Sequence, residues 1–248
     1  MMYSVIDFHS HILPGIDDGS SSVEESVVML QKEASHGIEH VIATPHFYAH
    51  RDNLSMFIEN RDRSEQLLRE AMAKYSGLPQ LSIGAEVYFF AGISESREIH
   101  RLAISSTNCI MVEMPHPPWT EAMYRELEQL HSKRGLIPII AHIDRYITRF
   151  RTFGINEKLA ELPVFVQANA EFFARSQTKS IALRMLRNGK IHLLGSDCHN
   201  LHSRSPNLGE AVNLISKRLG ASAIERINQY EHSILLSREP ILPTRVCE

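Results

Sequence analysis

The chain has few of the features that mark a secreted, membrane-bound or disulfide-stabilised protein. Its 248 residues include only three cysteines, Cys109, Cys198 and Cys247, which are too scattered for a disulfide framework, and the odd number is typical of a reducing compartment. No apolar run approaches the ~20 residues of a membrane span. The first residues also lack the basic region, apolar stretch and cleavage site of a secretory signal. We therefore expect a cytoplasmic protein without a membrane span.

The chain also lacks an excess of positive charge and any segment that would divide it. Lys and Arg total 26 against 29 Asp and Glu, a net charge of −3, so nucleic acid is not expected as a partner. There is no linker rich in Pro, Gly or Ser and no repeat of fixed period. We expect one domain over residues 1–248, a length that suits a single (β/α) barrel.

Short β-rich runs alternate with longer helical patterns along the whole chain. The predicted strands are residues 5–9, 40–44, 81–87, 109–114, 137–142, 164–169 and 191–195. The predicted helices are residues 23–36, 54–75, 119–134, 178–188 and 207–219, with short helices near 94–102 and 156–161. Seven strands, each followed by a helix or helical turn, predict an α/β fold, a distorted (β/α)7 barrel. A doubly wound open sheet is the alternative.

What the sequence has in abundance is histidine, and much of it follows predicted strands. Six of the seven strands end in residue types that bind metals, namely His9 and His11, His46, Glu86, Glu113, His142, and Asp197 and His199. Any one of these residues alone is more often hydrogen-bonded or solvated than a ligand. Because active sites of such barrels lie at the carboxyl ends of the strands, however, all of them are expected at one rim.

The spacing and chemistry of these residues favour a metal site. His9 and His11, like Asp197 and His199, are two residues apart, so both side chains of each pair project from one side of an extended segment. Carboxylates gathered at one rim repel one another unless cations neutralise them. Imidazole and carboxylate ligands without thiolate indicate Mn, Fe or Zn without distinguishing among them.

Six motifs in order along nearly the whole chain resemble a known superfamily. They are Asp7-Phe8-His9-Ser10-His11, Asp17-Asp18-Gly19, Thr44-Pro45-His46, Gly84-Ala85-Glu86-Val87-Tyr88, His142-Ile143-Asp144-Arg145-Tyr146 and Ser196-Asp197-Cys198-His199-Asn200. Together they resemble the polymerase and histidinol phosphatase (PHP) superfamily. Within it, the resemblance is closest to the bacterial manganese-dependent tyrosine phosphatases of capsule and exopolysaccharide loci.

The resemblance implies three divalent metal ions, with Mn favoured and Fe or Zn as alternatives. The implied ligands are His9, His11, Glu86 and Asp197 for the first ion, Glu86, Glu113 and His142 for the second, and Asp18, His46 and His199 for the third. Spacing alone does not distinguish Asp17 from Asp18 as a ligand, and Asp18 is chosen from the family pattern. Arg145 and Arg204 follow ligand residues closely enough to reach the same rim, where guanidinium groups suit phosphoryl oxygens.

The activity implied by the resemblance is hydrolysis of phosphotyrosine on a protein. The expected partner is an autophosphorylating tyrosine kinase that controls polysaccharide export. We hypothesise that Phe47, Tyr48 or Trp119 lines the approach for the substrate ring, although ordinary packing of these aromatic residues is the simpler interpretation.

Several alternatives remain open at the level of the sequence. Cys198 and Arg204 have the Cys-x5-Arg spacing of cysteine-dependent tyrosine phosphatases, but the loop between them has no glycine. A small phosphate monoester such as histidinol phosphate is a second possible substrate, and an inactive barrel that binds a partner is a non-enzymatic reading. Residues 23–36 and the C-terminal segment could pack between subunits of a homo-oligomer, although covering the barrel is simpler.

Overall fold

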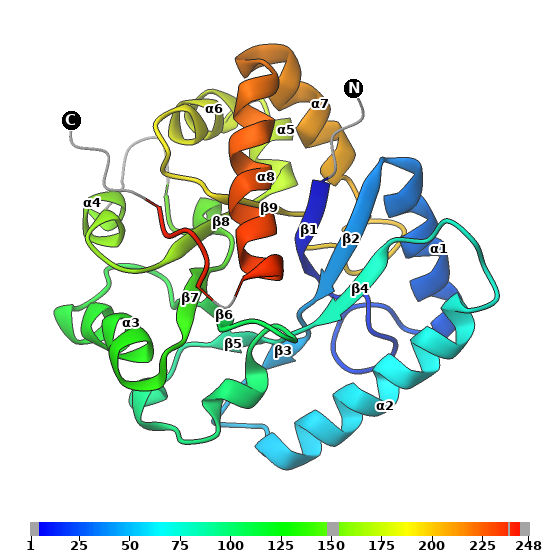
Figure 1. Cartoon of the computed structure of the whole chain (residues 1–248), viewed down its shortest axis with the longest axis horizontal. Coiled ribbons are helices and arrows are strands. Elements are labelled where there is room, and N and C mark those ends of the chain that lie inside the picture. The colour runs from blue at the N-terminus through cyan, green and yellow to red at the C-terminus, as the bar shows by residue number, and fades with distance from the viewer. Residues whose placement is uncertain (1–4, 148–153, 238, 244–248) are drawn as a thin grey trace.

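The computed structural model describes residues 5–147, 154–237 and 239–243, and its centre is a set of parallel strands. The strands are β1 (Val5–Ser10), β2 (Ile38–Ala43), β3 (His46–Phe47), β4 (Gln80–Ile83), β5 (Glu86–Tyr88), β6 (Cys109–Glu113), β7 (Ile137–Ile140), β8 (Phe165–Asn169) and β9 (Leu193–Gly195). They pair in the orders β1-β2-β4 and β3-β5-β6-β7-β8-β9. Figure 1 shows them curled in the middle of the molecule with helices around them.

The two sets of strands form one curled, barrel-like wall. The chain runs from β2 into β3 and from β4 into β5, and the amides of Gly84 and Glu86 donate to the carbonyls of Ala43 and Pro45, which continues the pairing across both breaks. At the other edge, the amide of Asp197 donates to the carbonyl of His9 over 2.8 Å, which holds the end of β9 beside β1. The predicted α/β barrel fold is confirmed, and the open-sheet alternative is wrong.

Eight α-helices and three 3₁₀ turns lie around the strands in the described part of the chain. The helices are α1 (Val23–Ser35), α2 (Leu54–Met72), α3 (Glu121–Arg134), α4 (Ile155–Ala160), α5 (Ala170–Ala174), α6 (Lys179–Arg187), α7 (Leu208–Leu219) and α8 (Ala221–Leu236). The turns are η1 (Ile93–Glu95), η2 (Ile99–Leu102) and η3 (Ile143–Arg145). The side chains of Ser22, Asn53 and Thr120 each accept a backbone N–H in the first turn of a long helix, so local capping fixes where these helices begin.

Several features of the sheet and helices differ from the prediction, and strand β3 and the short helix α5 are among the elements that were not predicted. The strand predicted over residues 81–87 is two strands, because Gly84 and Ala85 interrupt it. Helix α8 was not predicted, and in Figure 1 it lies over the strands near β1 and β9. Ile234 of α8 belongs to the buried cluster that fills the sheet interior with Phe8 and Phe165. The C-terminal helix therefore covers the barrel, as the simpler interpretation held.

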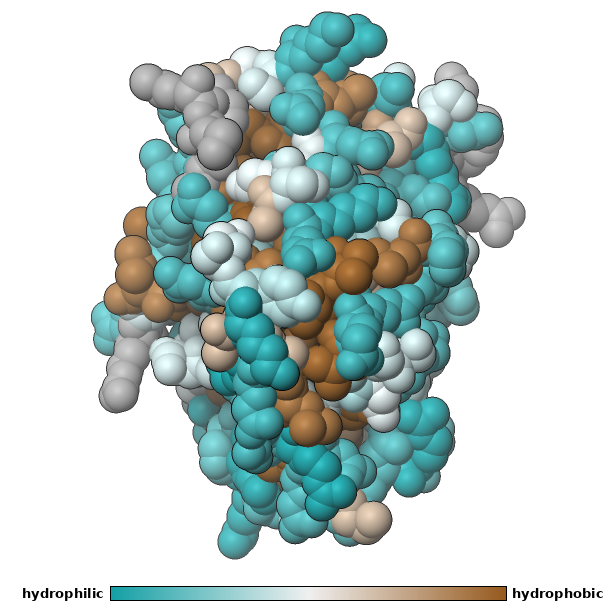
Figure 2. Space-filling model, turned by 90° about the vertical axis from the view of Figure 1, so that its right-hand side faces the viewer, coloured by the Kyte–Doolittle hydropathy of each residue, from teal (hydrophilic) through white to brown (hydrophobic). Residues whose placement is uncertain are grey.

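Figure 2 shows the side of the molecule that lies on the right in Figure 1, where hydrophilic side chains are interspersed with apolar ones. No helix among the described residues is long and apolar enough to cross a membrane. For function, the main effect of the sheet is to bring the carboxyl ends of β1, β6 and β9 to the same side as the first residues of β3 and β5.

Candidate metal centre

The residues predicted as metal ligands converge at the carboxyl ends of the strands. Three groups of these residues each place one nitrogen or oxygen atom per residue within 4.8 Å of the corresponding atoms of the others. The first group is His9, His11 and Glu86, and the second is His46, Glu86 and Glu113. The third group is His11, Asp18, His46 and His199. Their shared members, Glu86, His11 and His46, join the three groups into one cluster. Ligand residues that lie far apart in the sequence thus share a single site.

Glu86, at the start of β5, occupies the middle of this cluster and is 1% exposed. Its Oε2 lies 3.2 Å from Nε2 of His9 and 3.3 Å from Nε2 of His11. Its Oε1 lies 2.6 Å from Nε2 of His142, whose ring is also 3.6 Å from a carboxylate oxygen of Glu113. A single carboxylate therefore faces imidazoles on two sides, the arrangement expected of a bridging ligand.

Asp197, after β9, completes the inner part of the cluster. Its Oδ1 lies 3.6 Å from Nε2 of His9 and 3.5 Å from Nε2 of His11. His9 and His11 come from the end of β1, so the hydrogen bonds that hold β9 beside β1 also set this spacing.

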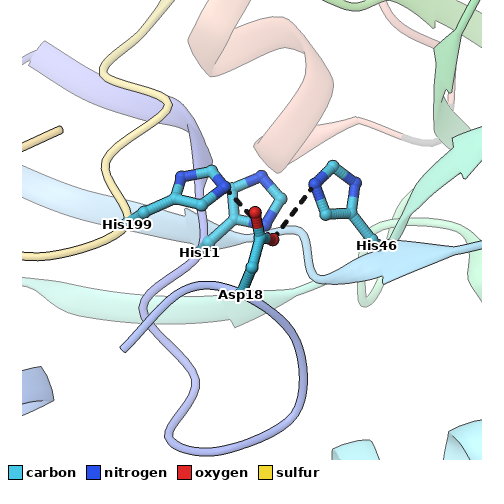
Figure 3. A group of neighbouring side chains, drawn as sticks. All are labelled: His11, Asp18, His46 and His199. Atoms are coloured by element: carbon cyan, nitrogen blue, oxygen red, sulfur yellow. Dashed lines mark ion pairs between the residues drawn. The ribbon is translucent and has the colours of Figure 1, made fainter. Parts of the chain in front are cut away.

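The outer part of the cluster is formed by Asp18 and three imidazoles (Figure 3). Oδ1 of Asp18 lies 3.5 Å from Nε2 of both His46 and His199. Asp17 takes a different role, because its Oδ2 accepts a hydrogen bond from Nδ1 of His11 over 2.7 Å and another from the His46 amide. Asp18 is 68% exposed and faces the cluster, whereas Asp17 is buried beside it.

Hydrogen bonds fix which ring nitrogen of three histidines faces the centre. Nδ1 of His9 donates to Oε1 of Gln167 over 3.3 Å, Nδ1 of His11 to Asp17, and Nδ1 of His199 to the carbonyl of Asp197 over 3.0 Å. Each assignment follows from the hydrogen-bond network, since the partner of Nδ1 can only accept. Nε2 is left to face the carboxylates in all three rings, as in histidines that bind metals.

Strand β8 contributes supporting amides that the sequence analysis missed. Oε1 of Gln167 accepts from the His142 amide over 2.6 Å as well as from His9, and Nδ2 of Asn169 donates to Asp197 over 2.8 Å. Gln167 and Asn169 alternate with apolar residues, so they lie on the same side of the strand as Phe165 of the interior. Two amides at alternate positions of an otherwise apolar strand are the signal that would have revealed them.

Two residues of the cluster have backbone conformations that residues other than glycine rarely adopt. His142 has φ 31° and Asp197 has φ 53°, both in the left-handed region. Such strain costs on the order of 1–3 kcal/mol and persists only where the surroundings impose it. The hydrogen bonds from the His142 amide to Gln167 and from the Asp197 amide to His9 impose it here.

The charges and unmatched atoms of the cluster fit divalent cations. Burial lowers the pKa of His11, but the hydrogen bond to Asp17 and the charges of Asp17 and Glu86 outweigh this effect and raise the pKa to about 10. Nδ1 of His46 and Oε2 of Glu86 are 2.9 Å apart, yet in this geometry neither makes a hydrogen bond with a described residue. A divalent cation at Nε2 would displace the imidazole proton and neutralise the carboxylates in its place.

Two arginines, Arg145 and Arg204, border the cluster. Arg145, in η3, donates to Glu113 over 2.9 Å and to Asp197 over 3.0 Å. Arg204 lies 2.6 Å from the other carboxylate oxygen of Asp197 and donates to Nε2 of His199 over 2.8 Å. Burial and the charges of His11 and Arg204 lower the pKa of His199 to about 4, so its neutral ring can accept this bond.

The cysteine next to Asp197 is unsuited to nucleophilic attack. Cys198 is fully buried, and burial together with the carboxylates of Glu33 and Asp7 raises the pKa of its thiol well above the usual value. A cysteine nucleophile instead needs a lowered pKa and access to substrate. The Cys-x5-Arg spacing is therefore not a phosphate loop in this chain.

The three aromatic residues considered for the substrate approach have different surroundings. Phe47 is 4% exposed and packs against Phe57, and Trp119 is 8% exposed, packs against Tyr146 and donates its N–H to the Pro115 carbonyl. Both belong to the core, so that hypothesis is wrong for them. Tyr48 is half-buried, and its ring lies 5.4 Å from the ring of His46.

A barrel-like parallel sheet whose carboxyl ends gather buried imidazoles and carboxylates defines a metal-binding α/β protein of the barrel class. Residues 5–237 match the family model for capsular polysaccharide synthesis, CpsB/CapC, and the chain belongs to this family.

Among its relatives, the tyrosine-protein phosphatase YwqE of Bacillus subtilis (strain 168) is 26% identical over 97% of this chain and 97% of that protein. The tyrosine-protein phosphatase CpsB of Streptococcus pneumoniae is 25% identical over 90% of this chain and 94% of that protein. A solved structure from work on YwqE and CpsB, described as unique metal-dependent tyrosine phosphatases, has a TM-score of 0.83 at 23% identity and covers 98% of this chain and 100% of that one. The resemblance to the bacterial tyrosine phosphatases of capsule loci is thereby confirmed.

Proposed function

We propose that this chain is a metal-dependent tyrosine-protein phosphatase of capsular polysaccharide synthesis. One observation carries the proposal: the imidazoles of His9, His11, His46 and His142 surround the buried carboxylate of Glu86 in a chain that belongs to the CpsB/CapC family. Relatives that align over nearly the whole chain are named as tyrosine phosphatases, which supports the substrate class.

The proposed centre holds three divalent ions, with Mn favoured and Fe or Zn as alternatives. The proposed ligands are His9, His11, Glu86 and Asp197; then Glu86, Glu113 and His142; then Asp18, His46 and His199. The geometry around Asp17 supports Asp18 as the outer ligand, because Asp17 already accepts hydrogen bonds from His11 and His46.

Clustered divalent ions lower the pKa of bound water toward neutrality and polarise phosphoryl oxygens. The protein's own part is to place and neutralise the phosphoryl group. Arg145 and Arg204 border Asp197 from two sides, and their guanidinium forks suit the equatorial oxygens of a transferred phosphoryl group. If Nε2 of His199 serves as a ligand, the N–H that Arg204 now donates to it is freed for the phosphate. A phenol, with a pKa near 10, leaves more readily than an alkyl alcohol and needs less protonation.

The proposed partner is a phosphotyrosyl protein, an autophosphorylating tyrosine kinase that controls polysaccharide export. The family's place in capsular polysaccharide synthesis supports this choice.

The test is a phosphatase assay on metal-stripped protein that is re-supplied with Mn, Fe, Zn or Mg. Phosphotyrosyl peptide, phosphoseryl peptide and histidinol phosphate are compared side by side, with metal content measured in parallel. We expect turnover of the phosphotyrosyl peptide to be restored by Mn and to exceed turnover of the others. Preferred turnover of histidinol phosphate would replace the substrate class, and a protein that binds no metal and hydrolyses nothing would favour an inactive, partner-binding barrel.

A further inference from the structure

An aromatic pair lies directly outside the metal centre, on the same two strands that supply two of its ligands. Strands β3 and β5 are paired in parallel, with His46 opposite Glu86 and Phe47 opposite Val87. The next position along places Tyr48 opposite Tyr88, and their rings are 5.6 Å apart. Tyr48 and Tyr88 therefore lie two residues beyond His46 and Glu86, toward the carboxyl ends of the strands.

Strand alternation explains why these two tyrosines share a side with the ligands. Side chains two residues apart on a strand project to the same side, whereas the residue between them projects to the other. Phe47 and Val87 are accordingly buried in the core. Tyr48 and Tyr88 are half-buried, with Tyr48 beside the His46 ring and Tyr88 in register with Glu113 of β6.

The loop after β3 fixes the Tyr48 ring in place. Asp52 accepts the Tyr48 amide over 2.8 Å and Nε of Arg51 over 2.9 Å. This holds the guanidinium of Arg51 4.5 Å from the centre of the Tyr48 ring, a cation–π contact. One face of the ring is therefore covered by a cation.

We propose that Tyr48 and Tyr88 form a wall that contacts the aromatic ring of the substrate and so selects aryl phosphates. This inference rests on the proposed phosphatase function and names the residues that distinguish a phosphotyrosyl group from a phosphoseryl group. Substrates reach such a centre from the carboxyl ends of the strands, so the ester group of a phosphate held there would lie on the side of this pair. Offset or edge-to-face contact between aromatic rings adds about 0.5–1.5 kcal/mol beyond area burial, and an alkyl ester gains none of it.

The wall is tested by binding of two non-hydrolysable phosphonates to the Mn-loaded protein, measured by calorimetry. Phenylphosphonate carries the ring and methylphosphonate does not. We expect wild-type protein to prefer phenylphosphonate. Tyr48→Leu and Tyr88→Leu should each raise the Kd of phenylphosphonate by about two- to twelvefold, the change that one aromatic contact implies, and leave the Kd of methylphosphonate unchanged.

Two variants serve as controls. Tyr48→Phe keeps the ring and should keep the preference. Tyr75→Leu removes a tyrosine that is 50% exposed in the segment after α2, and it should change neither Kd. Metal content is measured for every variant, so that loss of an ion is not mistaken for loss of the wall.

The outcomes separate this inference from the function on which it rests. If Tyr48→Leu and Tyr88→Leu weaken the binding of both phosphonates equally, or of neither, the proposed wall is wrong. The proposed phosphatase function is not affected by that result. If neither phosphonate binds to metal-loaded wild-type protein, the proposed phosphatase function fails and the wall fails with it.

Discussion

At the scale of single residues, burial rather than spacing decides what a side chain can do. Cys198 and Asp197 are neighbours, yet the thiol is enclosed behind the centre while the carboxylate faces His9, His11 and two arginines. The same distinction separates Asp17, which orients an imidazole, from Asp18, which faces the cluster. Two adjacent residues can therefore have quite different roles in the centre.

Substitution of these neighbours should give opposite results. Cys198→Ser should leave phosphatase activity largely intact, because a buried thiol with a raised pKa supplies no nucleophile. Asp197→Ala should abolish activity, because it removes a proposed ligand and the partner of both arginines. Turnover of a phosphotyrosyl substrate by metal-loaded variants checks both. Complete loss of activity in Cys198→Ser with normal metal content would restore the cysteine mechanism.

His192 should make stability depend on pH at a site away from the metal cluster. Its Nδ1 accepts the Val166 amide, its Nε2 donates to the Gly189 carbonyl, and burial lowers its pKa to about 4. Because the unfolded chain binds the proton more tightly, this contribution is complete above pH 6.5 and is lost as the pH falls toward 4. The loss should reach about 2 kcal/mol by pH 5.

Urea unfolding at pH 7.5 and pH 5 measures this loss. His192→Asn keeps a side-chain acceptor for the Val166 amide but does not titrate. The free-energy difference between wild type and this variant should shrink as the pH falls. An unchanged difference would show that His192 does not titrate on unfolding.

At the scale of elements, the centre depends on close packing of β9 against β1. A Cβ on Gly195 would lie 2.5 Å from Cβ of His9 and 2.7 Å from Nε2 of Gln167, so no side chain fits at this position. The absence of a side chain lets β9 bring Asp197 close to the imidazoles of β1.

Gly195→Ala should therefore displace His9 and lower activity by about 10- to 100-fold, the range seen when the support of a metal ligand is lost. Gly77→Ala is the matched control, because Gly77 has φ 76° but no atoms within 4 Å of an added Cβ. The control should lose some stability and keep its activity. The kcat/KM and metal content of both variants test this, and equal activities would contradict the packing argument.

Most helices and strands, and the candidate ligands that follow the strands, could be predicted from the sequence. The patterns that reveal them, alternation of polar and apolar residues in strands and the periodicity of helices, involve only residues close together in the sequence. Helix α8 was missed because Glu231, fully buried, interrupts its apolar side; it accepts the Ile6 amide over 3.2 Å, and burial raises its pKa well above the usual value. The supporting roles of Gln167 and Asn169 were missed because amides are not typical metal ligands. Such roles depend on which strand lies next to which, and local sequence does not specify that.

At the scale of the whole molecule, the centre joins strands from both halves of the chain, so metal and folding should be coupled. Removing the ions with a chelator leaves the buried carboxylates of Glu86 and Asp197 with only imidazoles and arginines to balance their charge. A ligand at 100 times its Kd stabilises a protein by about 2.7 kcal/mol, which for this size corresponds to about 5–11 °C in Tm per ion.

Calorimetric melting with and without chelator, followed by addition of Mn, measures this coupling. The Tm should fall on chelation and recover with Mn. Asp18→Asn should show a smaller fall, because it has one proposed ligand fewer. An unchanged Tm on chelation would mean that the barrel folds independently of its ions.

The unequal exposure of the two sides of the centre bears on how the enzyme is handled. His9, His11 and Glu86 are shut off from solvent, whereas Asp18 reaches the cluster from an open loop and is 68% exposed. Solvent and competing buffers meet the outer position first, so dialysis should empty it while the inner ions stay. Preparations would then carry less metal than the proposed centre can hold, and their specific activity would rise when divalent metal is added.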